Sequence, residues 1–205
     1  MIRVPPVGPL DAQIMIIGEA PGREEEARLQ PFVGASGLEL TKMLHEVGIS
    51  RADCYITNVV KVRPPGNDIS EFFLDKACKK PQQIILDGVV ELKKEIEQIK
   101  PKVIVALGNT PMWALTDRRG ITDWRGSFLK YGDAHLIPTY HPAAVLRQWD
   151  WRPVAVHDLR RARQCVDNPP VPPAYNFTIR PSIEAVLRFL MTVRATADAT
   201  PAGLP

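Results

Sequence analysis

Four polar side chains that could take part in binding or catalysis each stand at the end of an apolar run in this chain: Glu19, Asn58, Asn109 and His141. A histidine at such a place can meet negative charge that develops on an oxygen. An asparagine amide can accept one hydrogen bond and donate another to the same ligand. Each of the four alone is as well explained as a helix cap, a turn residue or, for His141, a satisfied buried histidine. Because the carboxyl ends of parallel strands share one edge of a sheet, the four together predict a common crevice.

The stretch between Gly18 and Gly37 adds further candidates. It is a loop of about twenty residues between a predicted strand and helix, which is long for a compact α/β unit and typical of a site. Phe32 lies in a short apolar island of this loop and is either a core plug or a flat face on which a base can stack. The acids Glu24 to Glu26 are by default a solvated surface.

The elements that position these residues alternate between buried strands and helices. Strands are predicted at residues 14–17, 54–60, 103–107 and 135–138. Helices are predicted to begin at Gly37, to fill most of 71–99 and to span 153–166, with a turn or short helix at 143–147. No helix is expected directly after the GEAPG turn. This alternation indicates an α/β protein with a single three-layer α/β/α domain around a central four-stranded parallel sheet.

We expect this domain to occupy residues 1–166 and a proline-rich tail or linker to occupy 167–205. Seven of the twenty prolines lie in the last forty residues. The segment NPPVPP at 168–173 is typical of a stiff linker. Further on, Ser182 can cap a short helix that reaches Leu190.

The composition is that of an ordinary globular protein, with 45% hydrophobic and 24% charged residues. No apolar run is long enough to span a membrane, and prolines interrupt the first ten residues where a signal peptide has its apolar core. We therefore expect a cytoplasmic protein without a membrane partner. Cys54, Cys78 and Cys165 are widely spaced and predict neither a disulfide framework nor a CxxC metal site. The net charge of +3 is compatible with nucleic acid as a partner.

Five segments, taken together and in this order, resemble the uracil-DNA glycosylase superfamily and most closely its family 4 branch. They are GEAPG, PFVGASG, YITNVVKVRPPGN, VIVALGN and TYHPAAVLR. The resemblance covers roughly residues 12–165, and separate motifs that agree are far more specific than any single one. It implies a four-stranded parallel sheet between helices. It also implies hydrolysis of the N-glycosidic bond of deoxyuridine in DNA, the first step of base excision repair.

The resemblance implies a catalytic set of Glu19, Ala20, Asn67 and His141. Glu19 and Ala20 stand in the motif that faces the base and the attacking water. Ala20 occupies the place of a catalytic aspartate in another branch, whereas family 4 also has a small residue there. Asn67 matches a second polar residue near the base or water, and His141 matches the histidine that stabilises the departing uracil anion.

The resemblance also implies that Glu25, Phe32 and Asn58 bind the base. Glu25 matches the acid beside the C5 edge of uracil, where a thymine methyl would clash, and Phe32 matches the residue that stacks on the ring. Asn58 matches the amide that reads the uracil edge. Uracil and cytosine differ at N3 and at position 4, and a fixed amide can accept from N3–H and donate to O4.

DNA contacts are expected from Val145 and Leu146, at the place where the superfamily inserts an apolar wedge into the duplex, and from Arg147 and Arg125 as phosphate contacts. Valine at the first wedge position is shorter than the leucine of many relatives. It therefore predicts a preference for single-stranded uracil DNA, or for U·G over U·A pairs, because these make base extrusion cheaper. Arg118, Arg119 and Arg152 lie nearby, and the first two can equally be ordinary surface charge.

The cysteines depart from family 4, whose members usually hold an iron–sulfur cluster through four cysteines. Val62 stands at the third position, no cysteine lies near Gly88 at the fourth, and Cys54, Cys78 and Cys165 match none. We therefore expect no metal and no cofactor. The departure points to a cluster-free relative of a phage-associated kind, in some of which such a domain precedes a DNA polymerase. The expected partners are uracil-containing DNA and a polymerase or other replication protein, with the chain itself a monomer.

Three functions are weighed at this point. The first is an active uracil-DNA glycosylase, favoured by the filled pocket positions. The second is a catalytically weak or inactive DNA-binding accessory domain linked to a replication polymerase. The third, a nucleotide-binding module of another chemistry, lacks support because GEAPG matches neither G-x-G-x-x-G nor a P-loop.

Overall fold

The computed structural model describes residues 1–75, 77–171 and 180–198, and the side chains of 194–198 are not described. Two compact units divide the chain, Met1–Pro170 and Val171–Pro205. Within the described residues, none of the helices has the length and apolar content that a membrane crossing requires. The predicted linker at 168–173 extends into residues 172 and 173, which lie outside the described residues. The division into domains 1–166 and 167–205 stays a prediction.

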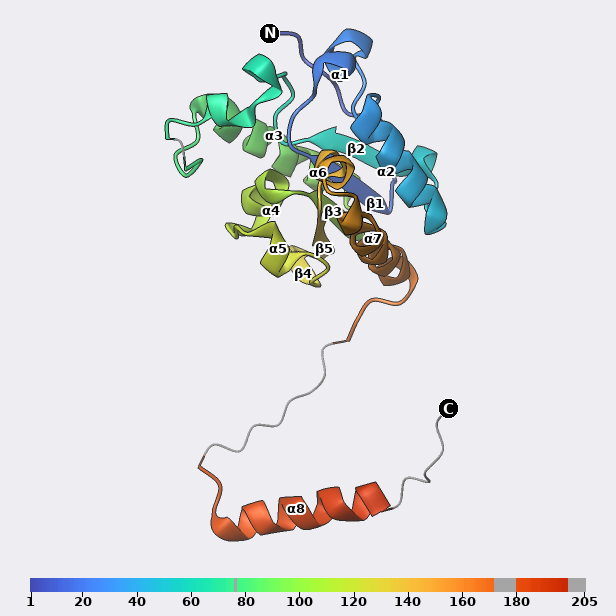
Figure 1. Ribbon diagram of the computed structural model, residues 1–205, viewed down its shortest axis with the longest axis vertical. Coiled ribbons are helices and arrows are strands. Elements are labelled where there is room, and N and C mark those ends of the chain that lie inside the picture. The colour runs from blue at the N-terminus through green and yellow to red at the C-terminus, as the bar shows by residue number, and fades with distance from the viewer. Residues whose placement is uncertain (76, 172–179, 199–205) are drawn as a thin grey trace. The chain divides into compact units, whose positions relative to one another are not determined.

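The first unit is built on a five-stranded sheet in the order β2-β1-β3-β5-β4 (Figure 1). The parallel strands are β1 (Ile14–Gly18), β2 (Cys54–Asn58), β3 (Val103–Leu107) and β5 (Ala134–Thr139). They confirm the four predicted strands. The fifth, β4 (Leu129–Tyr131), pairs antiparallel with β5 and was not expected. It has three residues and is not buried, so it carries no periodic signal in the sequence.

Helices cover both faces of the sheet, because each strand sends alternate side chains to opposite sides. Ile14 and Ile16 of β1 pack with residues of α2 (Ala35–Glu46) and α7 (Arg152–Asp167). Met15 and Ile17 pack on the other face with residues of α3 (Gln83–Ile99) and α4 (Asn109–Thr116). All five residues of β1, β2 and β3 are buried, as expected for strands covered on both faces.

Short elements complete the unit. They are α1 (Arg23–Arg28), α5 (Ile121–Trp124), α6 (Pro142–Arg147) and the single-turn helices η1 (Arg51–Asp53), η2 (Pro65–Asn67), η3 (Ile69–Phe72) and η4 (Trp149–Trp151). Of these, η1 directly precedes β2. The expectation that no helix follows GEAPG is wrong, because α1 begins directly after Gly22. Three glutamates in its first turn favour a helix start there, and their charge had been assigned to a solvated loop.

Other boundaries differ from the prediction for local reasons. The helical reading of 71–99 holds only from Gln83, where α3 begins. Leu38 of α2 and Leu86 of α3 are exposed. In the second unit, α8 (Ile183–Asp198) is longer than predicted, and Ser182 Oγ accepts a hydrogen bond from the Ala185 amide at 3.2 Å, as a capping serine does.

A buried carboxylate joins α7 to the sheet and to the segment after α5. Asp158 has no exposed surface. It accepts a hydrogen bond from Thr139 Oγ1 at 2.8 Å and one from Arg125 Nε at 2.8 Å, and Arg125 Nη2 forms an ion pair with it. Gly126 has φ +69°, and a side chain there would collide with Asp158. Arg125 is therefore held by an internal partner, and its expected contact with DNA phosphates stays a prediction.

We expect Arg125→Met to destabilise the protein by about 3–5 kcal/mol, because it leaves a buried carboxylate without its counter-charge. The measurement is the free energy of unfolding in urea at pH 7. Arg147→Met is the matched control, since Arg147 is exposed and forms no ion pair within the described residues. Equal stability of the two variants would contradict the structural assignment of Arg125.

Candidate active site

A cleft of about 630 Å³ opens at the carboxyl edge of the parallel strands. Glu19, Asn58, Asn109 and His141 all line it, one after each of β1, β2, β3 and β5. The other predicted residues on its wall are Ala20, Glu25, Phe32, Asn67 and Arg147. The structure thus brings the polar strand ends and the loop after β1 around one space.

His141 is fixed as the residue that caps α6. Its Nδ1 accepts a hydrogen bond from the Ala143 amide at 3.1 Å. Burial, followed by the positive charge of Arg147, lowers the pKa of His141 to about 4. At neutral pH the ring is therefore uncharged, and because Nδ1 is an acceptor, the proton resides on Nε2. The arrangement leaves an Nε2–H donor on a residue that lines the cleft.

Glu19 follows β1 at the same edge of the sheet and has a hydroxyl partner. Thr110 Oγ1, on α4, donates a hydrogen bond to its Oε2. Burial raises the pKa of Glu19, the Thr110 hydrogen bond opposes this rise, and the charge of Asp68 adds to it. The carboxylate can therefore take up a proton more readily than a solvated glutamate.

Glu25 ties together the two halves of the loop after β1. Its Oε2 accepts from the Gly22 amide at 3.1 Å, and its Oε1 accepts from the amides of Val33 and Gly34 at 3.0 and 2.8 Å. These amides lie at the amino ends of α1 and α2, so one carboxylate serves two helix starts. Glu25 lines the cleft while it holds the loop in shape.

Phe32 sits under strong backbone constraint. Its φ is +54°, a conformation that is uncommon for a large side chain. A side chain at Gly37 would collide with the Phe32 backbone. Arg51, which the sequence had not singled out, donates to the carbonyls of Pro31 and Phe32, both at 2.9 Å. The ring is buried and its centroid lies 5.8 Å from that of His141.

Two predicted asparagines differ from Asn58 in their surroundings. Asn58 is 4% exposed at the end of β2. Asn67 is exposed, has φ +61°, and accepts from Arg63 Nε at 2.6 Å, so it lies at the rim. Asn109 Oδ1 accepts from the amides of Gly120 and Ile121 at 3.2 and 2.8 Å, which makes it a cap for α5.

The two wedge candidates separate by burial. Val145 has no exposed surface and belongs to the hydrophobic core, whereas Leu146 is 43% exposed. The expectation that Val145 enters the duplex is therefore corrected, because its side chain packs inside the protein. The predicted preference for single strands and U·G pairs loses its basis, since it depended on a short Val145 wedge. Arg147 is exposed at the cleft.

Sequence reasoning missed an aromatic pair on the cleft wall. Tyr140 and Trp151 stack with ring centroids 4.4 Å apart and an interplanar angle of 15°. Tyr140 directly precedes His141, and this adjacency was the available signal. Trp151 reaches the cleft from η4, a position that no local pattern in the sequence indicates.

The resemblance to family 4 would place two cluster cysteines at Val62 and near Gly88, and the surroundings of these two residues do not fit such a group. Val62 is 7% exposed and packs in the core. A side chain at Gly88 would collide with the carbonyl of Val59, so no cysteine could replace this glycine without a backbone shift. Among the residues that the structure describes, no three His, Cys, Asp or Glu side chains are grouped to hold a metal ion.

Comparison with known proteins assigns the chain to a family. A sequence model described as the Uracil DNA glycosylase superfamily matches residues 5–160. The chain is 38% identical over 164 residues to the type-4 uracil-DNA glycosylase of Thermotoga maritima, covering 78% of this chain and 80% of that one. It is 37% identical to the type-4 enzyme of Saccharolobus solfataricus, over 82% and 78% of the two chains. A DNA polymerase of Bacillus phage SP01 is 30% identical over 74% of this chain and 16% of its own length.

The depressed pKa of His141 makes a prediction about stability. An unfolded histidine takes up a proton below about pH 6.5, whereas folded His141 does so below about pH 4. Between these values the unfolded state binds more protons, so stability is present above pH 6.5 and is lost as the pH falls. We expect the free energy of unfolding to drop more between pH 7 and pH 5 in the wild type than in His141→Asn.

Asparagine is a good helix cap, so this variant keeps the start of α6 while it removes the titrating ring. Glu19 is present in both proteins, and its own contribution cancels in the difference. Urea denaturation at pH 7, 6 and 5 measures the two slopes. Parallel slopes would show that His141 has an ordinary pKa.

Proposed function

The chain belongs to the uracil-DNA glycosylase superfamily, and we propose that it is an active uracil-DNA glycosylase. In this proposal it hydrolyses the N-glycosidic bond of deoxyuridine in DNA after base flipping, which initiates base excision repair. The observation that carries the proposal is the convergence of Asn58, Phe32 and His141 on one cleft. These are an amide, an aromatic face and a neutral imidazole donor.

Base recognition is assigned to Asn58 and Phe32. A flipped uracil can stack on the Phe32 ring. The Asn58 amide can accept from N3–H and donate to O4, a pattern that cytosine cannot satisfy because its N3 is an acceptor and its position 4 carries an amine. Glu25 stands on the same wall, and its anchored carboxylate would limit the space at C5, where thymine carries a methyl group.

Bond cleavage is assigned to His141 and Glu19. When the C1′–N1 bond breaks, its electron pair leaves with uracil and negative charge builds on O2, while positive charge builds on the sugar. The neutral Nε2–H of His141 can donate to O2, and one such donor typically lowers a barrier by a few kcal/mol. Glu19 would hold the water whose oxygen bonds to C1′ and would accept the proton that this water loses. Asn67 would lie at the rim, and Ala20 would leave room.

DNA is proposed to lie across α6 and η4. Leu146, now the exposed candidate for the wedge, would fill the space that the flipped base vacates. Arg147 would contact phosphate beside it.

An accessory domain with weak or no turnover is the second candidate, and the similarity to a phage DNA polymerase favours it. A polymerase or other replication protein would then be the partner.

The deciding experiment is uracil excision from a labelled oligonucleotide. We expect turnover by the wild type and a loss of about two orders of magnitude or more in Asn58→Asp, because aspartate replaces the donor to O4 with an acceptor. The same variant gains weak excision of cytosine, whose amine suits an acceptor. Asn109→Asp is the matched control from the same cleft. It keeps the oxygen that caps α5, so its rate should stay within a few-fold of wild type.

Absence of excision by the wild type, with binding to uracil DNA retained, would favour the accessory domain instead. Equal rates for Asn58→Asp and Asn109→Asp would remove Asn58 from base recognition.

We expect Leu146→Ala to slow excision from U·A duplexes by about tenfold while single-stranded substrate is cleaved nearly as before. A smaller side chain offsets less of the unstacking cost, and single strands do not carry this cost. The comparison of kcat/KM on the two substrates measures the effect, with the single-stranded rate as the internal control. A uniform loss on both substrates would assign Leu146 to folding rather than to the duplex.

A further inference from the structure

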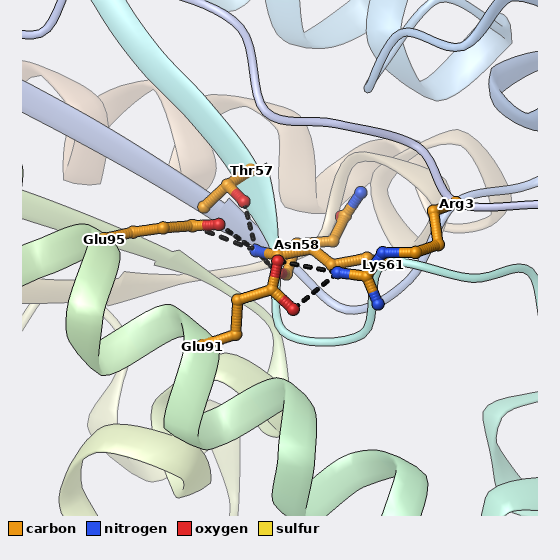
Figure 2. Close-up of polar contacts among 6 residues, drawn as sticks. All are labelled: Arg3, Thr57, Asn58, Lys61, Glu91 and Glu95. Carbon is orange, nitrogen blue, oxygen red and sulfur yellow. Dashed lines mark hydrogen bonds and ion pairs between the residues drawn. The ribbon is translucent and has the colours of Figure 1, made fainter.

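A buried lysine outside the cleft contacts the main chain of Asn58, the residue proposed to recognise the base. Lys61 is 4% exposed and follows β2 by three residues. Its Nζ donates to the Asn58 carbonyl at 2.7 Å and to Thr57 Oγ1 at 2.6 Å, and it pairs with the Glu95 carboxylate at 2.8 and 3.0 Å (Figure 2). All three protons of the ammonium therefore have acceptors. We call Lys61, Glu95, Thr57 and the Asn58 carbonyl the Lys61 network.

The position of the Asn58 carbonyl explains why it needs this partner. β2 is the edge strand of the sheet, and residues two apart on a strand direct their backbone groups to the same side. On the outer side, Ile56 exchanges two hydrogen bonds with Val7 of the N-terminal segment, at 2.7 and 3.0 Å. The backbone carbonyl of Asn58 faces the same outer side. There it accepts its hydrogen bond from the Lys61 side chain instead of from a neighbouring strand.

The inner side of this segment is also fixed. Val59 and Val60 donate their amides to the carbonyls of Gly18 and Glu19 at 2.9 and 3.0 Å. The main chain around Asn58 is thus held from β1 on one side and from Lys61 on the other. Since Glu95 lies on α3, the Lys61–Glu95 ion pair ties the end of β2 to that helix.

A second, exposed tie lies one helical turn away. Arg3 pairs with Glu91 of α3 at 2.6 Å, and the Val4 amide donates to the Lys61 carbonyl at 2.7 Å. Arg3 is 62% exposed, so this pair contributes little compared with the buried one. It offers a control for the effect of removing any ion pair to α3.

Both ties border one cavity. It measures about 230 Å³ and is lined by Arg3, Lys61, Val62, Gly88 and Glu91. The two ion pairs therefore join the N-terminal segment and the segment after β2 to the same helix, α3.

We propose that Lys61 is a positioning residue for uracil recognition, which holds the Asn58 main chain against α3 through Glu95. The inference rests on the proposed function in assigning base reading to Asn58. Lys61 itself lines no part of the cleft. Loss of its hydrogen bond would let the Asn58 amide turn away from the base, while the DNA-binding surface around Leu146 and Arg147 would be untouched.

The test uses two variants: one removes both charges of the buried pair, and the other keeps Lys61 but replaces its counter-charge with a neutral amide. Lys61→Met/Glu95→Leu removes both charges, because removing one partner alone would leave the other buried and unpaired. Glu95→Gln keeps the volume and Lys61 itself but weakens its anchor. Arg3→Met is the matched control. Urea denaturation establishes which variants fold as the wild type does.

We expect kcat/KM for uracil excision to fall at least tenfold in the double variant and about threefold to tenfold in Glu95→Gln. Binding to a DNA that carries an abasic-site analogue should stay within about twofold of wild type, and Arg3→Met should match the wild type in both assays. A residue that only stabilised the fold would not lower excision in a stably folded variant. Wild-type kcat/KM in both Glu95 variants would overturn the proposal, and Glu95→Gln decides alone if the double variant does not fold.

Amide hydrogen exchange separates this proposal from the proposed function. In the folded variants, the amides of Val59 and Val60 should exchange at least tenfold faster than in the wild type, while that of Val105 in β3 should not change. This outcome holds even if the wild type excises no uracil, in which case the proposed function fails and the positioning role stands. Unchanged exchange at Val59 and Val60 would overturn the positioning role whatever the activity.

Discussion

The site depends on the absence of a side chain at Gly18. This residue ends β1 in register with Asn58 on β2, so the two strand ends lie side by side. A Cβ on Gly18 would collide with Asn58 Oδ1 and would press into the Phe32 ring. Glycine therefore lets an aromatic face and an amide approach each other over the end of the sheet. Without this close approach, one flat ligand could not contact both groups.

Hydrogen bonds between polar side chains and the main chain hold the groups around Gly18 in place. Glu25 accepts hydrogen bonds from three amides of the loop after β1, and Arg51 donates to the Phe32 carbonyl. Together they keep Phe32, whose backbone φ is positive, in one position. Lys61 does the same for Asn58 from outside the cleft. Each of these polar side chains acts on the main chain of a residue that faces the cleft, and each compensates for the irregular backbone of a functional loop.

Burial also sets the charge of the cleft. His141 is neutral because burial of its ring and the nearby charge of Arg147 lower its pKa, whereas burial raises the pKa of Glu19. A neutral donor at one strand end and a carboxylate at another can serve a reaction in which negative charge leaves with a base and positive charge remains on a sugar. Arg147 keeps positive charge at the rim, where DNA phosphates would approach.

The sequence by itself determined the four parallel strands, the strand-end residues and the family, because buried β runs and the GEAPG and TYHP motifs are local signals. It could not distinguish Val145 from Leu146, since adjacent helical residues point in different directions and only packing decides which is buried. It could not show that Arg125 pairs with Asp158, 33 residues away, or that Asn109 caps α5. These contacts, like those of Thr110 with Glu19 and of Lys61 with Glu95, join residues that are not neighbours in the chain, so only the tertiary structure decided them.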